Sequence, residues 1–269
     1  MIGASYAERL HASGWFVGGI SARNPTVAKA LEAGIIDCGT IDVTKEFVAE
    51  FDIIVFALYP KLFIEWISKY QDCFKPGAIV TDVTGVKGSV VYTVQEMLRK
   101  DVEFIAAHPM AGRELSGIDN RCTKVFDGAN YIVTPTKINT QEAIDTACEL
   151  GRILGFGHIS VLTPEEHDEM IAFLSQLTHC IAVSLMCCKD STHLVDYTGD
   201  SFRDLTRIAN INANMWTELF MMNRNQLLRQ MDLFQDEFAR LKDALAHGDE
   251  ATMKEMMKTS TERRKYFNK

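Results

Sequence analysis

Asp52-Ile-Ile-Val-Phe-Ala-Leu58 is the stretch that decides the fold, because it is apolar from Ile53 onward and rich in β-branched residues. Such a run is typical of a strand that is buried on both faces of a parallel sheet. Gly77-Ala-Ile-Val-Thr-Asp82 repeats the pattern. Further strands are predicted at 16–20, 103–107, 131–134 and 158–162, and helices at 2–12, 24–34, from about 61, 89–99 and 141–154. This alternation predicts a doubly wound, mainly parallel α/β sheet.

The pattern changes at Thr163-Pro-Glu-Glu166, where Thr163 can cap a helix, Pro164 suits its first turn and Glu166 completes a capping box. Strand signals disappear beyond this point, and helices are predicted at 164–189, 201–222, 223–247 and 249–266. Met, Leu and Phe recur at helical spacing in the third of these, which indicates a helix–helix interface. We therefore expect a dinucleotide-binding domain at 1–162 and a helical domain at 163–269.

Composition limits the classes of function. With 269 residues, 47 % hydrophobic and 24 % charged, the chain has the composition of an ordinary globular protein. Its 28 basic and 36 acidic residues leave a net charge of −8, which argues against nucleic-acid or membrane-surface binding. The seven cysteines include no C-x-x-C pair, so we expect reduced thiols and no metal. No uninterrupted apolar run approaches the ~20 residues of a membrane span and no signal-peptide pattern is present, so we expect a cytoplasmic protein.

The first residues, Met1-Ile-Gly3-Ala-Ser5, resemble the end of the G-x-G-x-x-G fingerprint of a Rossmann-type fold. Only Gly3 of the three glycines is present and no strand precedes it, so we expect a truncated chain whose stability and cofactor binding are weak. After the second predicted element, Ser21 and Arg23 stand where NAD-binding enzymes usually carry an acidic residue. A hydroxyl and a guanidinium suit a 2′-phosphate, which favours NADP over NAD. A solvated loop is the alternative for this turn.

The string Ala106-Ala-His-Pro-Met-Ala-Gly-Arg-Glu-Leu-Ser-Gly117 places His108 at the end of a predicted strand, before a polar loop. Ligands of open α/β sheets bind at the carboxyl ends of the strands. This string resembles the prephenate/arogenate dehydrogenase family. Three other strings resemble that family in the same order, namely Thr81–Gly88, Leu177–Ala182 and Ser201–Ala209 followed by Met215-Trp216. The resemblance covers nearly the whole chain.

The resemblance implies the NAD(P)-dependent oxidative decarboxylation of a cyclohexadienol acid in tyrosine biosynthesis. A hydride leaves C4 for the nicotinamide, the C4 hydroxyl loses its proton, and the ring carboxylate leaves as CO2. His108 matches the catalytic histidine, which accepts a hydrogen bond from that hydroxyl. Glu114 of the same loop matches a residue that orients groups near the substrate, and Arg113 is a further candidate for substrate binding.

On the helical domain, the resemblance implies that His179 and Arg207 bind the substrate, and an always-charged Arg suits its carboxylates. Asp204 lies three residues before Arg207 and can orient it, and Trp216 matches a position near the site. A salt-bridged helix face is the alternative for Asp204 and Arg207. Many members carry Ser where this chain has Gly85, so we expect Thr84, or a water molecule, to supply that hydroxyl. Thr84 is also expected among the cofactor-binding residues.

We therefore expect a prephenate dehydrogenase that forms a homodimer through its helical domain. An arogenate dehydrogenase is one alternative, and a truncated remnant that serves as a non-catalytic subunit is another. A β-hydroxyacid dehydrogenase would need a catalytic Lys on the first helix of the second domain. The chain has only Lys189 at the far end of that helix, which disfavours this class.

Overall fold

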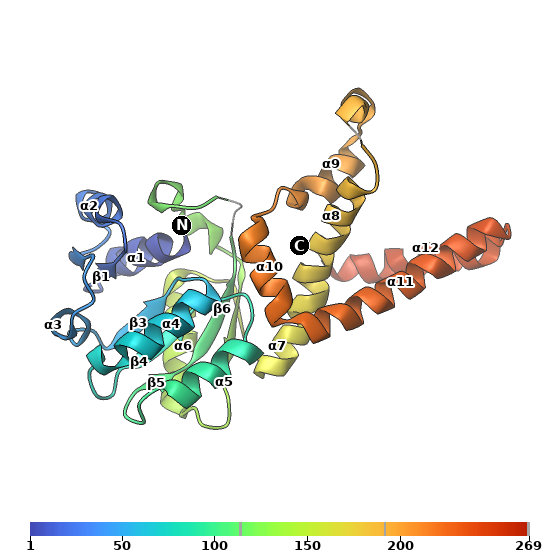
Figure 1. Cartoon of the computed structure of the whole chain (residues 1–269). Coiled ribbons are helices and arrows are strands. Elements are labelled where there is room, and N and C mark those ends of the chain that lie inside the picture. The colour runs from blue at the N-terminus through green and yellow to red at the C-terminus, as the bar shows by residue number, and fades with distance from the viewer. Residues whose placement is uncertain (113–114, 191, 268–269) are drawn as a thin grey trace.

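The computed structural model describes residues 1–112, 115–190 and 192–267. The first 160 or so residues form an α/β body, and the remainder forms an elongated array of helices on one side of it (Figure 1). Two of the expected site residues, Arg113 and Glu114, lie outside the described residues.

The described residues of the body form eight strands in three hydrogen-bonded groups, ordered β1-β2, β3-β4-β5 and β6-β7-β8. All pairs are parallel except β6 with β7, so the prediction of a mainly parallel sheet is confirmed. The strands are β1 (Gly18–Ile20), β2 (Cys38–Thr40), β3 (Ile53–Phe56), β4 (Ile79–Asp82), β5 (Glu103–Phe104), β6 (Ala106–Met110), β7 (Asn130–Thr134) and β8 (His158–Val161).

Helices cover both faces of these strands (Figure 1). One apolar cluster joins β4 to α4 and α5 through side chains such as Val80, Phe63 and Val91. A second cluster, on the opposite face, contains Tyr6 of α1 and Leu154 of α6. The doubly wound arrangement is thus confirmed. The helices of the body are α1 (Ile2–Ala12), α2 (Asn24–Glu32), α3 (Lys45–Val48), α4 (Pro60–Tyr70), α5 (Gly88–Met97) and α6 (Gln141–Leu154).

The strand predicted at 103–107 is divided into β5 and β6. Ile105 still donates its N–H to the Val80 carbonyl at 3.0 Å. Two residues later, Ala107 N–H bonds to a side chain of β4 and not to its backbone, because it donates to Asp82 Oδ1 at 3.2 Å. The chain then leaves β4 and continues as β6 beside β7, which brings His108 to the edge of the sheet.

The helical region begins as predicted. Thr163 and Glu166 form the expected capping box at the start of α7 (Pro164–Ile171). The predicted helix 201–222 is instead broken, because the Asn212 side chain accepts from Met215 N–H at 3.1 Å and starts a new helix. The remaining elements of this region are a π-helical segment (Ala172–Leu177), α8 (Thr178–Cys187), α9 (Asp200–Thr206), α10 (Ala213–Met222), α11 (Arg224–Ala246), α12 (Glu250–Arg264) and 3-10 segments at Thr192–Tyr197, Arg207–Ala209 and Lys265–Phe267.

One continuous helix of the described residues, Pro164–Cys187, is long and apolar enough to cross a membrane by length and composition. The sequence had not predicted such a segment. The same test is passed by core helices of soluble proteins, so it is weak evidence for a membrane span. This helix also carries His167, Asp168 and Gln176, which are buried polar residues. We therefore interpret it as a helix that joins the two regions, with only 28 % of its most apolar window buried within this chain.

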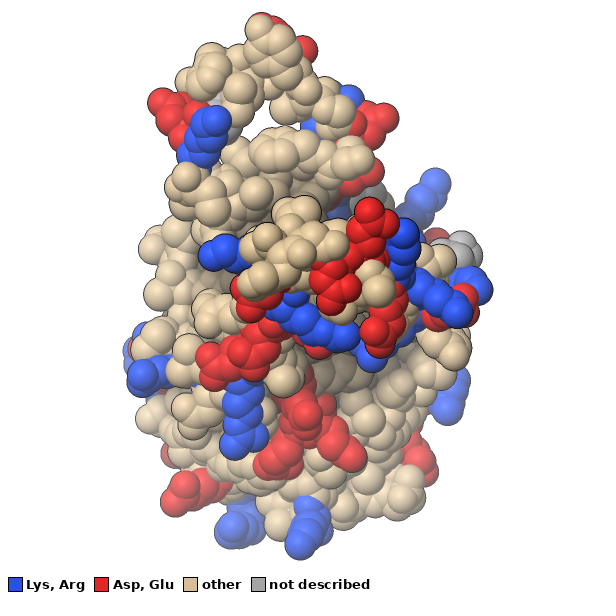
Figure 2. Space-filling view, turned by 90° about the vertical axis from the view of Figure 1, so that its right-hand side faces the viewer, with Lys and Arg blue, Asp and Glu red and all other residues tan. Residues whose placement is uncertain are grey.

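The far helices bury little of their apolar surface within one chain. The described residues of α9, α10 and α12 include none that is buried. Large apolar side chains of α11 are exposed, among them Leu233, Phe238 and Leu245. Figure 2, which views the molecule from the side of α11 and α12, shows acidic and basic side chains intermingled at this end, with uncharged areas around them.

Candidate active site

A buried ion pair holds the carboxyl end of β4. Lys87 Nζ lies 2.9 Å and 2.8 Å from the two carboxylate oxygens of Asp82, and 2.6 Å from the Ala107 carbonyl oxygen. Both charged side chains are completely buried. Burial lowers the pKa of Lys87, while the Asp82 carboxylate opposes that shift. The pair ties the loop 83–87 to the start of β6, so it fixes the backbone on which His108 stands.

Thr84 belongs to the same buried cluster. Its hydroxyl contacts an Asp82 carboxylate oxygen and lies 3.0 Å from the Val86 carbonyl oxygen and 3.3 Å from Lys87 Nζ. Only 3 % of Thr84 is exposed. The expectation that Thr84 presents its hydroxyl to a reacting substrate is therefore not met in this structure, because the buried hydroxyl is engaged by Asp82, Val86 and Lys87.

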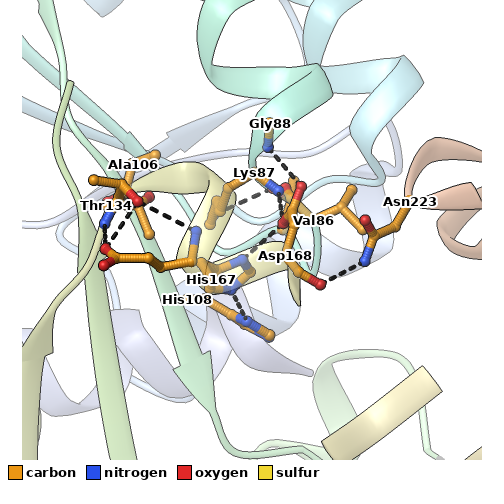
Figure 3. A network of polar contacts seen from close by, with 12 residues as sticks. Val86, Lys87, Gly88, Ala106, His108, Thr134, His167, Asp168 and Asn223 are labelled. Carbon is orange, nitrogen blue, oxygen red and sulfur yellow. Dashed lines mark hydrogen bonds and ion pairs between the residues drawn. The ribbon is translucent and has the colours of Figure 1, made fainter. Parts of the chain in front are cut away.

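His108 is linked to two residues of α7 (Figure 3). Its Nδ1 lies 2.9 Å from His167 Nε2, and His167 Nδ1 lies 2.8 Å from Asp168 Oδ1. An ionised carboxylate only accepts, so the proton of His167 stands on Nδ1 and its Nε2 accepts from His108 Nδ1–H. This assignment leaves a lone pair on His108 Nε2.

The environment keeps both imidazoles neutral. Burial, then His167, then Lys87 lower the pKa of His108 well below its ordinary value. Burial also lowers the pKa of His167, although its hydrogen bond to Asp168 opposes the shift. A histidine that stays neutral near pH 7 is a hydrogen-bond acceptor and a proton acceptor.

Asp168 joins the two regions of the molecule. Its Oδ1 accepts from Lys87 N–H and its Oδ2 from Gly88 N–H, each at 2.8 Å, at the start of α5. Asn223 holds the main chain of Asp168 by donating to its carbonyl oxygen at 2.8 Å. Sequence reasoning missed His167, Asp168 and Asn223. The only signal was a His-Asp pair among the acidic residues at 165–169, which look like an ordinary helix start.

The free nitrogen of His108 faces Gly85 and α10. A methyl group built on Gly85 would lie 3.8 Å from His108 Nε2 and 3.7 Å from the Leu219 side chain. A serine at this position would therefore bring a hydroxyl next to the imidazole, and glycine leaves that space to a ligand or to solvent.

The helical region brings two of its expected site residues together. The rings of His179 and Trp216 stack at 3.7 Å between centroids, and His179 Nδ1 donates to the Ser175 carbonyl at 2.8 Å. Arg207 begins the 3-10 turn that packs against α8, the helix that carries His179. Asp204 is exposed on α9, and its expected role in orienting Arg207 stays a prediction.

The expected nucleotide-binding residues lie at the carboxyl edge of the strands. A methyl group on Gly3 would come 2.8 Å from the Ala57 side chain, so glycine lets α1 begin close to the end of β3. The first turn of α1 has no side-chain cap, which leaves N–H groups able to bind an anion. Ser21 and Arg23 follow β1, and Ser21 Oγ accepts from Arg23 N–H at 3.3 Å. Backbone N–H groups and the side chains of Ser21 and Arg23 are the types of group that bind phosphate and ribose, and their role here stays a prediction.

Comparisons with known proteins match the α/β body and the helical region to two separate family models. The family model for the nucleotide-binding domain of prephenate dehydrogenase matches residues 6–156, and the model for its dimerization domain matches residues 163–259. The chain is 29 % identical to a cyclohexadienyl dehydrogenase of Zymomonas mobilis, over 88 % of this chain and 81 % of that protein. It is 27 % identical to a prephenate dehydrogenase of Bacillus subtilis, over 69 % of this chain and 51 % of that protein.

Solved structures agree in fold over nearly the whole chain. A prephenate dehydrogenase of Aquifex aeolicus, in complex with hydroxyphenyl propionate and NAD+, superposes with a TM-score of 0.90 and 27 % identity, over 99 % of this chain and 95 % of that one. An arogenate dehydrogenase of Synechocystis superposes with a TM-score of 0.86 and 24 % identity, over 99 % of this chain and 96 % of that one, a likeness that bears on the fold alone.

Proposed function

Because this chain belongs to the prephenate dehydrogenase family, we propose that it converts prephenate to 4-hydroxyphenylpyruvate and CO2 while reducing a nicotinamide dinucleotide. The observation that carries the proposal is the chain of contacts from Asp168 through His167 to His108, which leaves His108 Nε2 facing the gap at Gly85. Arogenate, with an amino group in place of the side-chain keto group, is the alternative substrate.

A bound nicotinamide dinucleotide would supply the acceptor for the hydride that leaves C4 of the substrate. His108 Nε2 accepts a hydrogen bond from the C4 hydroxyl and takes its proton as the carbonyl forms. The bond between C1 and the carboxylate then breaks, its electron pair makes the ring aromatic, and CO2 leaves. The oxygen at C4 recovers the proton from His108, so the step needs no external acid. Asp168 and His167 support His108 by keeping the hydrogen on Nδ1 throughout.

Binding of the substrate falls to the helical region in this proposal. Arg207 pairs with a carboxylate of the substrate, His179 contributes a hydrogen bond, and Trp216 covers the ring. These roles are supported by the stacking of His179 on Trp216 and by the packing of the Arg207 turn against α8. Arg113 and Glu114 remain candidates by resemblance alone.

For the cofactor, the backbone at Gly3 would hold the pyrophosphate, and Ser21 and Arg23 would hold the adenosine ribose. The turn from Gly19 to Asn24 contains no carboxylate, which supports NADP as the preferred cofactor. We further propose that the enzyme is a homodimer, supported by the exposed apolar side chains of α11 and by the match to a dimerization domain. A cytoplasmic location is proposed by analogy with its biosynthetic relatives.

Steady-state assays with four substrate and cofactor pairs test the proposal. Prephenate or arogenate is combined with NADP+ or NAD+, and reduced cofactor and CO2 are measured together. Turnover that is fastest with prephenate and NADP+ is expected. Faster turnover with arogenate would assign the alternative substrate. Absence of both turnover and dinucleotide binding would indicate a non-catalytic protein.

A further inference from the structure

Helix α10 lies between the α/β body and α8 (Figure 1). Trp216 on this helix stacks on His179 of α8. Leu219 and Met222, which lie beside Trp216 on the same helix, pack against the apolar cluster of the body that contains Phe63 and Val91. Leu219 also borders the space between Gly85 and His108 Nε2. The orientation of α10 therefore affects both the proposed substrate-binding pair, His179 and Trp216, and the space next to the proposed base, His108.

A single side chain of α10 caps a helix of the body. Glu218 Oε1 accepts from Lys61 N–H at 2.8 Å, at the start of α4. Tyr59, at the N-cap of α4, makes no side-chain cap, and Pro60 has no N–H to donate. An acidic side chain at the first turn of a helix also interacts favourably with the helix dipole. The start of α4 is thus completed by a residue that lies 157 positions later in the sequence.

The start of α4 is directly connected to the expected nucleotide side. The residues between β3 and α4 are Ala57, Leu58 and Tyr59. Ala57 touches the first turn of α1, because a methyl group on Gly3 would lie only 2.8 Å from its side chain. A displacement of α1 or of this short connection would therefore move the N–H group that Glu218 binds.

We propose that Glu218 is a positioning residue that couples the nucleotide side to the substrate side through the start of α4. The proposal rests on the proposed function, since it takes a dinucleotide and a cyclohexadienol acid as the two ligands. The coupling would act through the hydrogen bond between Glu218 of α10 and Lys61 N–H of α4. Each ligand would favour the relative position of α10 and α4 that binds the other ligand better. Asp168 makes the comparable contact to α5, but it also holds His167 and so belongs to the catalytic machinery.

Calorimetric titration of the full chain measures this coupling. The Kd of NADP+ is determined without and with saturating 4-hydroxyphenylpyruvate, and the ratio of the two values is the coupling factor. Glu218→Ala is expected to reduce the factor by about 3- to 10-fold, the range that loss of a helix cap allows. Glu218→Gln should retain most of it, because the amide oxygen still accepts from Lys61 N–H. Glu65→Ala, an exposed change of equal charge on α4, is the matched control and should leave the factor unchanged.

Hydrogen exchange of the ligand-free protein gives an independent measurement. Glu218→Ala should accelerate exchange at the start of α4 and along α10, whereas Glu65→Ala should not. A coupling factor in Glu218→Ala equal to that of the wild type would overturn the proposal. If the wild type neither binds nor turns over these ligands, the proposed function fails instead. Hydrogen exchange then tests the positioning role of Glu218 alone. Unchanged protection of α10 in Glu218→Ala would overturn that role.

Discussion

The α/β body and the helical region differ in how completely each is packed within one chain. The body buries large side chains entirely, including Phe63, Phe104, Phe126 and Leu154. The helical region leaves side chains such as Leu233 and Phe238 exposed, and α9, α10 and α12 bury no described residue. The body can therefore hold His108 by its own packing, while the helical region, which carries the residues expected to bind substrate, leaves apolar side chains of α11 uncovered within one chain. This contrast predicts separate effects on turnover, binding and association.

The largest effect is expected for His108→Asn. Asparagine cannot take a proton from the C4 hydroxyl, so kcat should fall by about 10²- to 10⁴-fold, the usual contribution of a general base. KM should change much less, because the substrate contacts lie on the helical region. The matched control is His158→Asn, which alters an exposed histidine of β8. A near-normal kcat in His108→Asn would show that another group takes the proton.

Arg207→Ala should act mainly on binding. Loss of the charge-assisted bond to a carboxylate is expected to raise KM about 10- to 100-fold with little change in kcat. Arg203→Ala is the control, because Arg203 lies on α9 nearby and pairs with Asp200. An unchanged KM with a lower midpoint of thermal unfolding would mean that Arg207 serves the helix packing instead.

Dilution of the protein should affect hydrogen exchange in the helical region but not in the α/β body. If a second copy covers the apolar side chains of α11, a hundredfold dilution should accelerate hydrogen exchange in α8 to α12 by about threefold or more. Exchange in β3, β4, α4 and α5 should not depend on concentration. Equal sensitivity of both regions, or of neither, would contradict the contrast in packing.

The smallest effect is expected from pH. The lowered pKa of His108 keeps the imidazole neutral below its ordinary pKa of about 6.5, so kcat/KM should change less than about twofold between pH 7.5 and 6. Unfolded His108 and His167 regain ordinary pKa values and bind more protons, so the free energy of unfolding should fall as pH drops through that value. A pH–rate profile that loses most activity by pH 6 would imply a base with an ordinary pKa.

Strong local patterns predicted much of this molecule. The apolar runs that became β3 and β4, the helix bounds of α1 and α6, and the capping box at Thr163 follow from residues close in sequence, although β3 buries only Phe56 fully. The short elements β2 and α3 were missed, because three or four residues carry too little periodicity. The break before α10 was missed because the capping role of Asn212 depends on its side-chain geometry, which an Asn in a polar stretch does not reveal.

The site was predicted less completely than the fold. His108 was identified from its place at a strand end, but its partner His167 lies 59 positions away and contributes through tertiary packing. Thr84 was assigned to the reacting centre because its neighbour is Gly85. The direction of a hydroxyl inside a loop cannot be inferred from sequence, and the structure turns it toward Asp82.

The central claim is that Asp168 and His167 leave His108 neutral, with the hydrogen on Nδ1 and the lone pair on Nε2. Nitrogen NMR of isotope-labelled histidine, with the His108 signals assigned by comparison with His108→Asn, tests this claim directly. At pH 7 the account predicts a protonated Nδ1 and an unprotonated Nε2 for His108, and loss of that preference in Asp168→Asn. A doubly protonated His108, or one with its hydrogen on Nε2, would contradict the account.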